Sequence, residues 1–321
     1  MKVLITGGSG FVGQHAIRRL LAEGHRVVAP ARREEACIQL RSLGASSMRL
    51  DYGDRPALNR AMEGCEAVVH VAAHLKMWGP WQAFEASNVI LTDQVLQSAK
   101  EGGAKRFVHI SAASVIMKDP VPIIGADESW PLTSHRQLPY SATKAIAEQR
   151  VLAAHGEHFK TIALRPPFIW GPGDAVDADL GAKVRKGQFA WINQGQYRYA
   201  TCHVQNLCHA IALALPSEAT GAFFITDGPE ITLREFLTQR LQASGLSSPR
   251  LSVPATVAWA SGRAMEAMWA TGWLAGDPPL TRETVRLIGY PFSLNTRQAR
   301  ALLGYTPSID LSEGLRQCSR S

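Results

Sequence analysis

The sequence predicts an α/β protein built on a Rossmann-type doubly wound parallel sheet, with a smaller C-terminal α/β lobe that binds substrate. In the first 170 residues, short apolar runs rich in β-branched residues alternate with helical patterns. A glycine-rich turn joins the first run, "KVLIT", to the first helical pattern. Apolar runs separated by helices are typical of parallel strands that are buried on both faces and joined by crossover helices.

The expected elements follow one another in order along this first part of the chain. We expect strands at residues 2–6, 25–31, 46–51, 65–73, 106–111 and 161–166. We expect helices at residues 11–24, 34–44, 55–64, within 81–103, and over 139–150.

After about residue 170 the alternation weakens, and the turn "WGPGD" is followed by shorter elements. Residues 221–228 still have the pattern of a strand, and 231–245 predict a helix because Thr232 and Glu235 have the spacing of a capping box. We therefore expect a dinucleotide-binding domain at residues 1–170. A smaller substrate-binding lobe should follow at 171–321, with some of its strands and helices returning to the main sheet.

Composition and charge restrict the class of protein. No apolar run reaches the roughly 18 residues of a membrane span, and the first strand pattern begins too early to leave room for a signal peptide. The net charge of +7 is spread along the chain without basic runs, so we expect no nucleic-acid partner. The five cysteines include no C-x-x-C pair, which is typical of reduced thiols. We expect a cytoplasmic protein.

One cluster of potential metal ligands is present in "CHVQNLCH", which contains Cys202, His203, Cys208 and His209. Their spacing matches no usual pair of zinc ligands, and the run "AIALAL" that follows predicts a core helix. We therefore expect no metal.

The turn "TGGSGFVG" predicts a phosphate-binding loop. It lies between a strand pattern and a helix pattern, the context that the motif requires. Glycine permits a tight turn and close approach of a ligand, and the helix N-terminus offers unpaired N–H groups to a pyrophosphate. The residues expected to bind the dinucleotide here are Gly7, Gly10, Phe11, Val12 and Gly13.

The end of the second strand favours NADP(H) over NAD(H). An acidic residue there binds a ribose 2′-hydroxyl, whereas arginine accommodates a 2′-phosphate. The stretch "VVAPARREE" has Arg32 and Arg33 at this place, and guanidinium groups bind phosphate bidentately. The alternative is that both arginines are simply solvated at the start of a helix.

A tyrosine and a lysine one helical turn apart form the candidate catalytic pair. In "LPYSATKAIAEQR", Tyr140 and Lys144 share a helix face, with Cβ atoms roughly 5–6 Å apart. A neighbouring ammonium favours the phenolate, so Lys144 is expected to lower the pKa of Tyr140 and to allow proton transfer near neutral pH. Such pairs also occur by chance on exposed helices, so the spacing alone does not assign a function.

With "TGGSGFVG" and "PYSATK" the chain resembles the extended short-chain dehydrogenase/reductases over nearly its whole length. The resemblance implies that Tyr140 exchanges a proton with the substrate oxygen and that Lys144 also holds the nicotinamide ribose. It implies a serine after the strand at 106–111 that holds the substrate oxygen, either Ser111 or Ser114. In "HISAASV", Ala112 stands where relatives commonly have a second hydroxyl.

Further stretches resemble the 3β-hydroxysteroid dehydrogenase-like branch, which also contains dihydroflavonol-reductase-like proteins and bacterial 2-alkyl-3-oxoalkanoate reductases. The tail from residue 278 to 307 and the "WGPW" stretch carry this resemblance. It implies a homodimer and places further residues along the cofactor: Asp51 and Tyr52 beside the adenine, Ala72, Ala73 and His74 along its length, and Pro167 and Ile169 near the nicotinamide.

The expected substrate is hydrophobic. Met77, Trp78 and Trp81 follow the strand at 65–73, where the family builds one pocket wall, and Trp170, Phe189 and Trp191 are candidates for another. We expect NADP(H)-dependent reduction of a 3-oxoacyl or sterol-like ketone, or the reverse reaction. Two alternatives remain: an NAD-dependent sugar epimerase or dehydratase, and a non-catalytic NADP(H)-binding regulator, which the hydroxyl missing at Ala112 favours.

The tryptophan-rich stretch at residues 255–275 has three interpretations. It contains Trp259, Trp269 and Trp273 in a helical pattern. Such a stripe packs in a core, closes over a substrate pocket as a lid, or contacts a membrane surface. We predict the lid.

Overall fold

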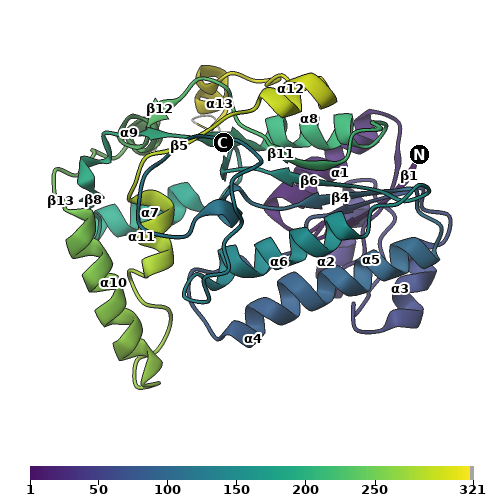
Figure 1. Ribbon diagram of the computed structural model, residues 1–321, viewed down its shortest axis with the longest axis horizontal. Helices are drawn as coiled ribbons and strands as arrows, with labels where there is room; N and C mark the ends of the chain where they lie inside the picture. Colours follow the sequence, from purple (N-terminus) through teal and green to yellow (C-terminus); the bar gives the residue numbers. More distant parts are fainter. Residues whose placement is uncertain (244, 319–321) are drawn as a thin grey trace.

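A six-stranded parallel sheet forms the centre of the molecule (Figure 1). The computed structural model describes residues 1–243 and 245–318. The strand order is β11-β6-β4-β3-β1-β2, and each neighbouring pair is parallel. The strands are β1 (Lys2–Thr6), β2 (Arg26–Val28), β3 (Ala67–His70), β4 (Arg106–Ile110), β6 (Lys160–Arg165) and β11 (Gly221–Phe224). The predicted doubly wound sheet is confirmed, and its strand order reverses between β1 and β3, where ligands bind in such folds.

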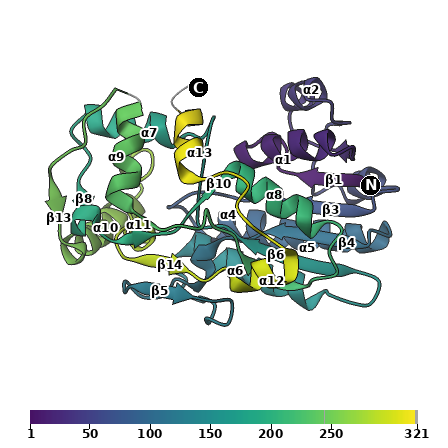
Figure 2. The same ribbon diagram turned by 90° about the horizontal axis from the view of Figure 1, so that it is seen from above.

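Helices cover both faces of this sheet. One face packs against α1 (Phe11–Ala22), α2 (Glu34–Ser42), α8 (Val204–Ala214) and α12 (Arg297–Leu303). The other face packs against α3 (Arg55–Met62), α5 (Leu91–Glu101) and α6 (Pro139–Ala153). Figure 2 shows the sheet seen from above, with α1 and α2 on one side of it and α5 and α6 on the other. Each face therefore buries its own apolar cluster, as uninterrupted apolar strands require.

The strand predicted at residues 46–51 does not form. Only isolated bridges link this segment to the edge of the sheet, Val28 with Ser46 and Ala31 with Arg49. The reason is Pro30, which lies between the two bridges and has no N–H to donate to a ladder. The helix predicted within 81–103 is continuous but begins as α4 (Trp81–Phe84) and a π-helical segment, η1 (Glu85–Ile90).

The second lobe is built from short strands and helices. A four-stranded sheet has the order β12-β9-β14-β5, and two-stranded pairs join β7 to β10 and β8 to β13. These strands are β5 (Ile123–Ala126), β7 (Phe168–Trp170), β8 (Trp191–Ile192), β9 (Arg198–Tyr199), β10 (Thr201–His203), β12 (Ile231–Thr232), β13 (Ser252–Val253) and β14 (Phe292–Leu294). The short helices are η2 (Ala113–Ile116) and η3 (Asn193–Gly195), and the longer ones are α7 (Val176–Arg185), α9 (Leu233–Ala243), α10 (Ala255–Ala270), α11 (Arg282–Ile288) and α13 (Leu311–Cys318).

The chain crosses between the two parts more than once. β5 comes from before residue 170 yet pairs with β14, whereas β11 returns to the edge of the main sheet. The capping box predicted at the start of α9 is confirmed, since the Thr232 N–H donates to Glu235 Oε2 and the Glu235 N–H to Thr232 Oγ1, both at 3.1 Å.

The tryptophan-rich stretch forms α10, which extends along one side of the second lobe (Figure 1). A narrow stripe of Ala255, Ala258, Gly262 and Glu266 is buried. Trp259 packs on a small apolar cluster beside α11, and Trp273 beyond the helix is 91% exposed. Within the described residues, no helix has both the length and the apolar character to cross a membrane.

Candidate active site

The glycine turn between β1 and α1 is shaped for close approach of a ligand. Gly7 has φ of 68°, and a Cβ there would lie 2.7 Å from the Ala72 nitrogen. A Cβ at Gly13 would lie 2.2 Å from the Gly7 carbonyl oxygen. Gly10 has no side chain to cap α1, so N–H groups in the first turn of this helix have no side-chain acceptor. They remain available to a ligand bound where the strand order reverses. The residues present therefore fit a dinucleotide pyrophosphate.

The segment after β3, residues 71–74, lies against the glycine turn, and together they form the cradle expected to hold the dinucleotide. The Ala72 N–H donates to Thr6 Oγ1 at 3.2 Å, and the His74 N–H donates to Asn88 Oδ1 at 2.7 Å. The Asn88 amide in turn donates to Thr143 Oγ1 on α6 at 3.0 Å. Asn88 is 1% exposed and was not identified from the sequence. It ties the cofactor side of the site to the helix that carries Tyr140.

Arg32 and Arg33 lie between β2, which ends at Val28, and α2, which begins at Glu34. Both are exposed, and within the described part of the chain neither makes an ion pair. Burial raises the pKa of Tyr52 to about 12, and its hydroxyl donates to the Pro30 carbonyl oxygen at 3.1 Å. The positive charge of Arg32 lowers the pKa of Tyr52 and so opposes this rise, which means that Arg32 lies near the Tyr52 phenol. The two guanidinium groups remain free to bind an anion at the position predicted for a 2′-phosphate.

Lys144 is held inside the protein by two acceptors. It is 2% exposed, and its Nζ donates to the Ile110 carbonyl oxygen at 2.7 Å and lies 3.3 Å from His109 Nε2. Burial lowers the pKa of Lys144 to about 7, with the charge of Glu148 opposing the shift. An ammonium with this pKa can exchange a proton near neutral pH.

A pair of buried imidazoles lies behind Lys144. The rings of His70 and His109 stack with centroids 5.5 Å apart, and His70 contacts Thr6 Oγ1 at 2.8 Å and Thr92 Oγ1 at 2.9 Å. Burial, followed by the charge of Lys144, lowers the pKa of His70 to about 3 and that of His109 well below its usual value. Both rings are therefore neutral, and His109 Nε2 accepts a hydrogen bond from Lys144. Neither histidine was identified from the sequence.

Tyr140 corrects one expectation from the sequence. Burial raises its pKa, and the carboxylate of Glu283 raises it further. The predicted lowering by Lys144 is therefore wrong in this structure, because removal from water and the charge of Glu283, both of which disfavour the phenolate, determine the direction of the shift. The phenol keeps its proton at neutral pH and is a donor, as ketone reduction requires.

Glu283 on α11 fixes the start of the tyrosine helix. Its carboxylate accepts hydrogen bonds from the N–H groups of Tyr140 at 3.2 Å and Ser141 at 2.9 Å, and from Ser141 Oγ at 2.9 Å. The residue that precedes the helix, Leu138, has no side-chain acceptor, so Glu283 caps α6 from a distant part of the chain. Nothing in the sequence predicted this contact, because 143 residues separate Glu283 from Tyr140.

Ser111 and Ser114 follow β4, and the structure buries both. Their hydroxyl oxygens have no hydrogen-bond partner among the described residues. The backbone of Ser111 is fixed, since its N–H donates to the Leu164 carbonyl oxygen at 2.8 Å. A buried hydroxyl without a hydrogen-bond partner destabilises the folded state unless a ligand supplies that partner. Both serines can therefore donate to a substrate oxygen, and Ala112 between them cannot.

A cavity of about 250 Å³ lies beside the start of α6. Met77, Trp78 and Trp81, predicted to form a pocket wall, line it together with Gly79, Arg136, Gln137, Pro139, Glu266 and Arg282. Arg282 donates to Glu266 Oε2 and to Gln137 Oε1, each at 2.6 Å, so the other side of the cavity is polar. α10 contributes Glu266 and no tryptophan to the lining.

Trp170 and Trp191 do not line a pocket, so that part of the prediction is wrong. Trp170 is fully buried against Phe236 and donates from Nε1 to Asp227 Oδ2 at 2.7 Å. Trp191 is 2% exposed, stacks edge-on with Phe189, and donates to the Pro249 carbonyl oxygen. These aromatic side chains pack in the core of the second lobe.

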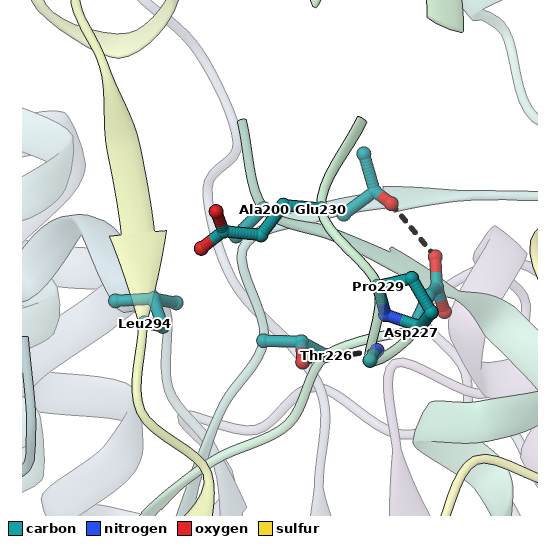
Figure 3. Close-up of a pocket in the computed structure, with 8 residues that line it drawn as sticks. Ala200, Thr226, Asp227, Pro229, Glu230 and Leu294 are labelled. Carbon is teal, nitrogen blue, oxygen red and sulfur yellow. Dashed lines mark hydrogen bonds between the residues drawn. The ribbon is translucent and has the colours of Figure 1, made fainter. Parts of the chain in front are cut away.

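A second hollow lies at Asp227, with a volume of about 10 Å³ (Figure 3). It has space for about one water molecule. Asp227 already accepts hydrogen bonds from Thr201 Oγ1 at 2.8 Å, Asn206 Nδ2 at 2.8 Å and the His203 N–H at 2.5 Å. This carboxylate therefore stabilises the core and is not a binding site.

The "CHVQNLCH" segment belongs to β10 and α8. Burial raises the pKa of the thiols of Cys202 and Cys208, so both are protonated. The described residues contain no group of three or more His, Cys, Asp or Glu side chains arranged to hold a metal ion.

Comparison with known proteins identifies the relatives of this chain. Residues 4–253 match the model of the 3-beta hydroxysteroid dehydrogenase/isomerase family. The chain is 36% identical to the 2-alkyl-3-oxoalkanoate reductase of Stenotrophomonas maltophilia, over 100% of this chain and 99% of that protein. It is 36% identical to the 4-hydroxy-2-methyl-3-oxo-4-farnesyl-3,4-dihydroquinoline-1-oxide ketoreductase of Stigmatella aurantiaca, over 98% and 95%. It is 31% identical to the decarboxylating sterol-4-alpha-carboxylate 3-dehydrogenase of Dictyostelium discoideum, over 98% of both chains.

A solved structure supports the fold. The structure of MoeE5 in complex with UDP-glucuronic acid and NAD superposes with a TM-score of 0.75 at 22% identity, covering 100% of this chain and 98% of that one. The glycine turn and the strand-order reversal of the present chain are features of such dinucleotide-binding folds.

Proposed function

The chain belongs to the 3-beta hydroxysteroid dehydrogenase/isomerase family, and on this premise we propose that it is an NADP(H)-dependent oxidoreductase that interconverts a hydrophobic ketone and its secondary alcohol. The observation that carries the proposal is the contact between α6, which carries Tyr140 and Lys144, and the end of β4. Lys144 Nζ donates to the carbonyl oxygen of Ile110, the residue before Ser111, and the hydroxyls of Ser111 and Ser114 have no partner among the described residues. Tyr140, Lys144 and the serines each have chemistry that a carbonyl reduction needs.

The steps assigned to the protein are binding, orientation and proton transfer. Ser111 or Ser114 donates a hydrogen bond to the carbonyl oxygen, which polarises the carbonyl. A nicotinamide dinucleotide held at the glycine turn would supply the hydride that reduces the carbonyl carbon. Tyr140 transfers its phenolic proton to the oxygen, and Lys144, with a pKa of about 7, replaces that proton. The carbonyl π bond breaks, and the product is a secondary alcohol.

NADP(H) is the proposed cofactor because two exposed arginines stand where the 2′-phosphate would lie. Calorimetry with NADPH and NADH compares the wild type with Arg32→Ala, and Arg33→Ala tests the lesser contributor. We expect tighter binding of NADPH by the wild type and loss of that preference in Arg32→Ala. Equal affinities in the wild type would defeat the assignment.

The proposed substrate class is apolar, a 3-oxoacyl or sterol-like ketone. Met77, Trp78 and Trp81 give the cavity an apolar wall, and each buried side chain of this size contributes about 1.5–3 kcal/mol. Two of the relatives are named for an oxoalkanoate and a sterol carboxylate, and a third for a farnesyl-bearing ketone.

Sedimentation velocity would check the predicted homodimer.

Consumption of NADPH across ketones graded by chain length and ring number tests the function. We expect turnover that rises with apolar size. An epimerase would retain bound NAD through purification and give no net oxidation of NADPH, and a non-catalytic regulator would bind NADPH without turning over any ketone. Either result would overturn the proposal.

A further inference from the structure

The outer face of α10 is apolar and exposed. Its exposed residues recur at three- and four-residue spacing, which puts them on one side of the helix, opposite the buried stripe. They are Val257, Ala260, Arg263, Ala264, Ala267 and Met268. The turn that follows α10 adds Trp273, which is 91% exposed, and Leu274, which is 44% exposed. A helix that is apolar on both sides is normally covered on both sides, so this outer face fits a partner.

The inner side of α10 is already covered by the protein. Ala255 and Ala258 pack with Val285 of α11. Glu266 Oε2 accepts a hydrogen bond from Arg282 Nε at 2.6 Å, and Glu266 lines the cavity beside α6. The outer face lies on the opposite side of the helix. Neither the second lobe nor a substrate in the cavity therefore covers it.

The unpaired charges of this segment are positive. The charged residues between 245 and 281 are Arg250, Arg263, Glu266 and Asp277. Both carboxylates are paired, Glu266 with Arg282 and Asp277 with Lys76 at 3.3 Å. Arg250 and Arg263 are exposed and make no ion pair in the described part of the chain. An apolar face with positive charges beside it is complementary to a surface of anionic lipid.

The shape of this part of the molecule also favours a lipid surface. Figure 1 shows α10 projecting from the second lobe, with its last turn at the extremity of the molecule. A specific interface between two proteins takes about 800 Å² from each partner, spread over a broad surface. A single projecting helix suits a deformable bilayer, into which its side chains can sink. Tryptophan is enriched at the boundary between lipid and water, where the exposed Trp273 would lie.

We propose that the outer face of α10, together with Trp273 and Leu274, binds the surface of a bilayer that contains anionic lipid. The helix lies along that surface and does not cross the bilayer. Because Glu266 on the inner side lines the cavity, this contact places the cavity next to the lipid, where apolar compounds concentrate. The surface contact does not depend on the proposed reaction, and its test uses no substrate.

Co-sedimentation of the full chain with vesicles measures this contact. The vesicles are phosphatidylcholine alone and phosphatidylcholine mixed with an equal share of phosphatidylglycerol. We expect the wild type to bind the mixed vesicles, and Trp273→Ser to bind them about tenfold more weakly or worse, because a large apolar side chain is lost from the contact. Arg263→Gln should bind the mixed vesicles about fivefold more weakly, the effect of one cation near an anionic surface.

A matched control replaces an exposed apolar residue elsewhere. Leu302 is 58% exposed on α12, which lies at the other end of the molecule from α10 (Figure 1). Leu302→Ser should bind the mixed vesicles as the wild type does. Trp273→Ser should melt at the wild-type temperature, since the side chain is exposed. Met268→Ser, within the outer face, gives a second measure and should also weaken binding.

Three results would overturn the proposal. The first is a wild type that binds neither kind of vesicle. The second is equal binding of mixed vesicles by the wild type, Trp273→Ser and Met268→Ser, which would mean that the net charge of +7 alone attracts the chain to anionic lipid. The third comes from sedimentation velocity without lipid: self-association of the wild type that Trp273→Ser abolishes would make this face an interface between two copies of the chain.

Discussion

Replacing Glu283 by glutamine should change how the stability of the protein depends on pH. The carboxylate is 1% exposed and caps α6 at Tyr140 and Ser141. Burial raises its pKa from 4.5 to about 7, although the three hydrogen bonds from α6 act in the opposite direction. Glutamine keeps one oxygen that accepts from Ser141, loses the hydrogen bond from the Tyr140 N–H, and removes the titration, so the loss of that bond lowers the stability equally at every pH.

The sign and size of the expected change in the free energy of unfolding follow from this pKa shift. A carboxyl whose pKa is raised by folding stabilises the folded state below pH 4.5 and loses that contribution as the pH rises through 7. One pKa unit corresponds to about 1.36 kcal/mol. The wild-type protein should therefore lose about 2 kcal/mol of folding stability through this carboxyl between roughly pH 5.5 and pH 8. The free energy of unfolding of Glu283→Gln should therefore gain about 2 kcal/mol on the wild type over that interval.

Urea unfolding followed by tryptophan fluorescence at both pH values measures this difference. Glu157→Gln, at an exposed glutamate, serves as the control and should follow the wild type. If the unfolding free energies of Glu283→Gln and the wild type change in parallel between the two pH values, the claim that burial raises the pKa of Glu283 is refuted. A change of the opposite sign would mean that the helix N–H groups outweigh burial and hold the pKa below its usual value.

Three further predictions test other parts of the site. Gly13→Ala places a Cβ 2.2 Å from a backbone carbonyl oxygen and should weaken NADPH binding by tenfold or more, whereas Gly156→Ala, in open space, should not; equal binding by both variants contradicts the cradle. His109→Phe removes an acceptor of the Lys144 ammonium, so the limb of the pH–rate profile assigned to that lysine should move to lower pH, and an unmoved limb refutes the contact. Trp269→Ala, one turn beyond the part of α10 that lines the cavity, should raise KM most for the longest ketones with little change in melting temperature; a much lower melting temperature with normal KM would assign it to packing.

The elements of the main sheet could be predicted because each is local. A parallel strand buried on both faces is an uninterrupted apolar run, and β1, β3, β4 and β6 all have this pattern. The strand at 46–51 failed because its partner strand ends before Pro30. The small sheet of the second lobe was not predicted, since strands of two to four residues carry no period.

The candidate site was predictable only where a motif is contiguous. Tyr140, Lys144 and the serines come from two short stretches, and their roles stay predictions. Asn88 and Glu283 act through contacts between segments far apart in the sequence, which no spacing shows. The direction of the Tyr140 pKa depends on burial, and whether Trp170 lies in a pocket or in the core depends on packing, so neither could be read from composition.

The kinetics of Tyr140→Phe test the central claim most directly. The variant lacks only the hydroxyl that is proposed to give its proton to the ketone oxygen. On a ketone that the wild type reduces, we expect kcat to fall by about 100-fold or more. The affinity for NADPH, measured by calorimetry on the same preparation, should stay within about twofold, because the glycine turn and the arginines after β2 are unchanged. Wild-type turnover by Tyr140→Phe with intact NADPH binding would contradict the mechanism.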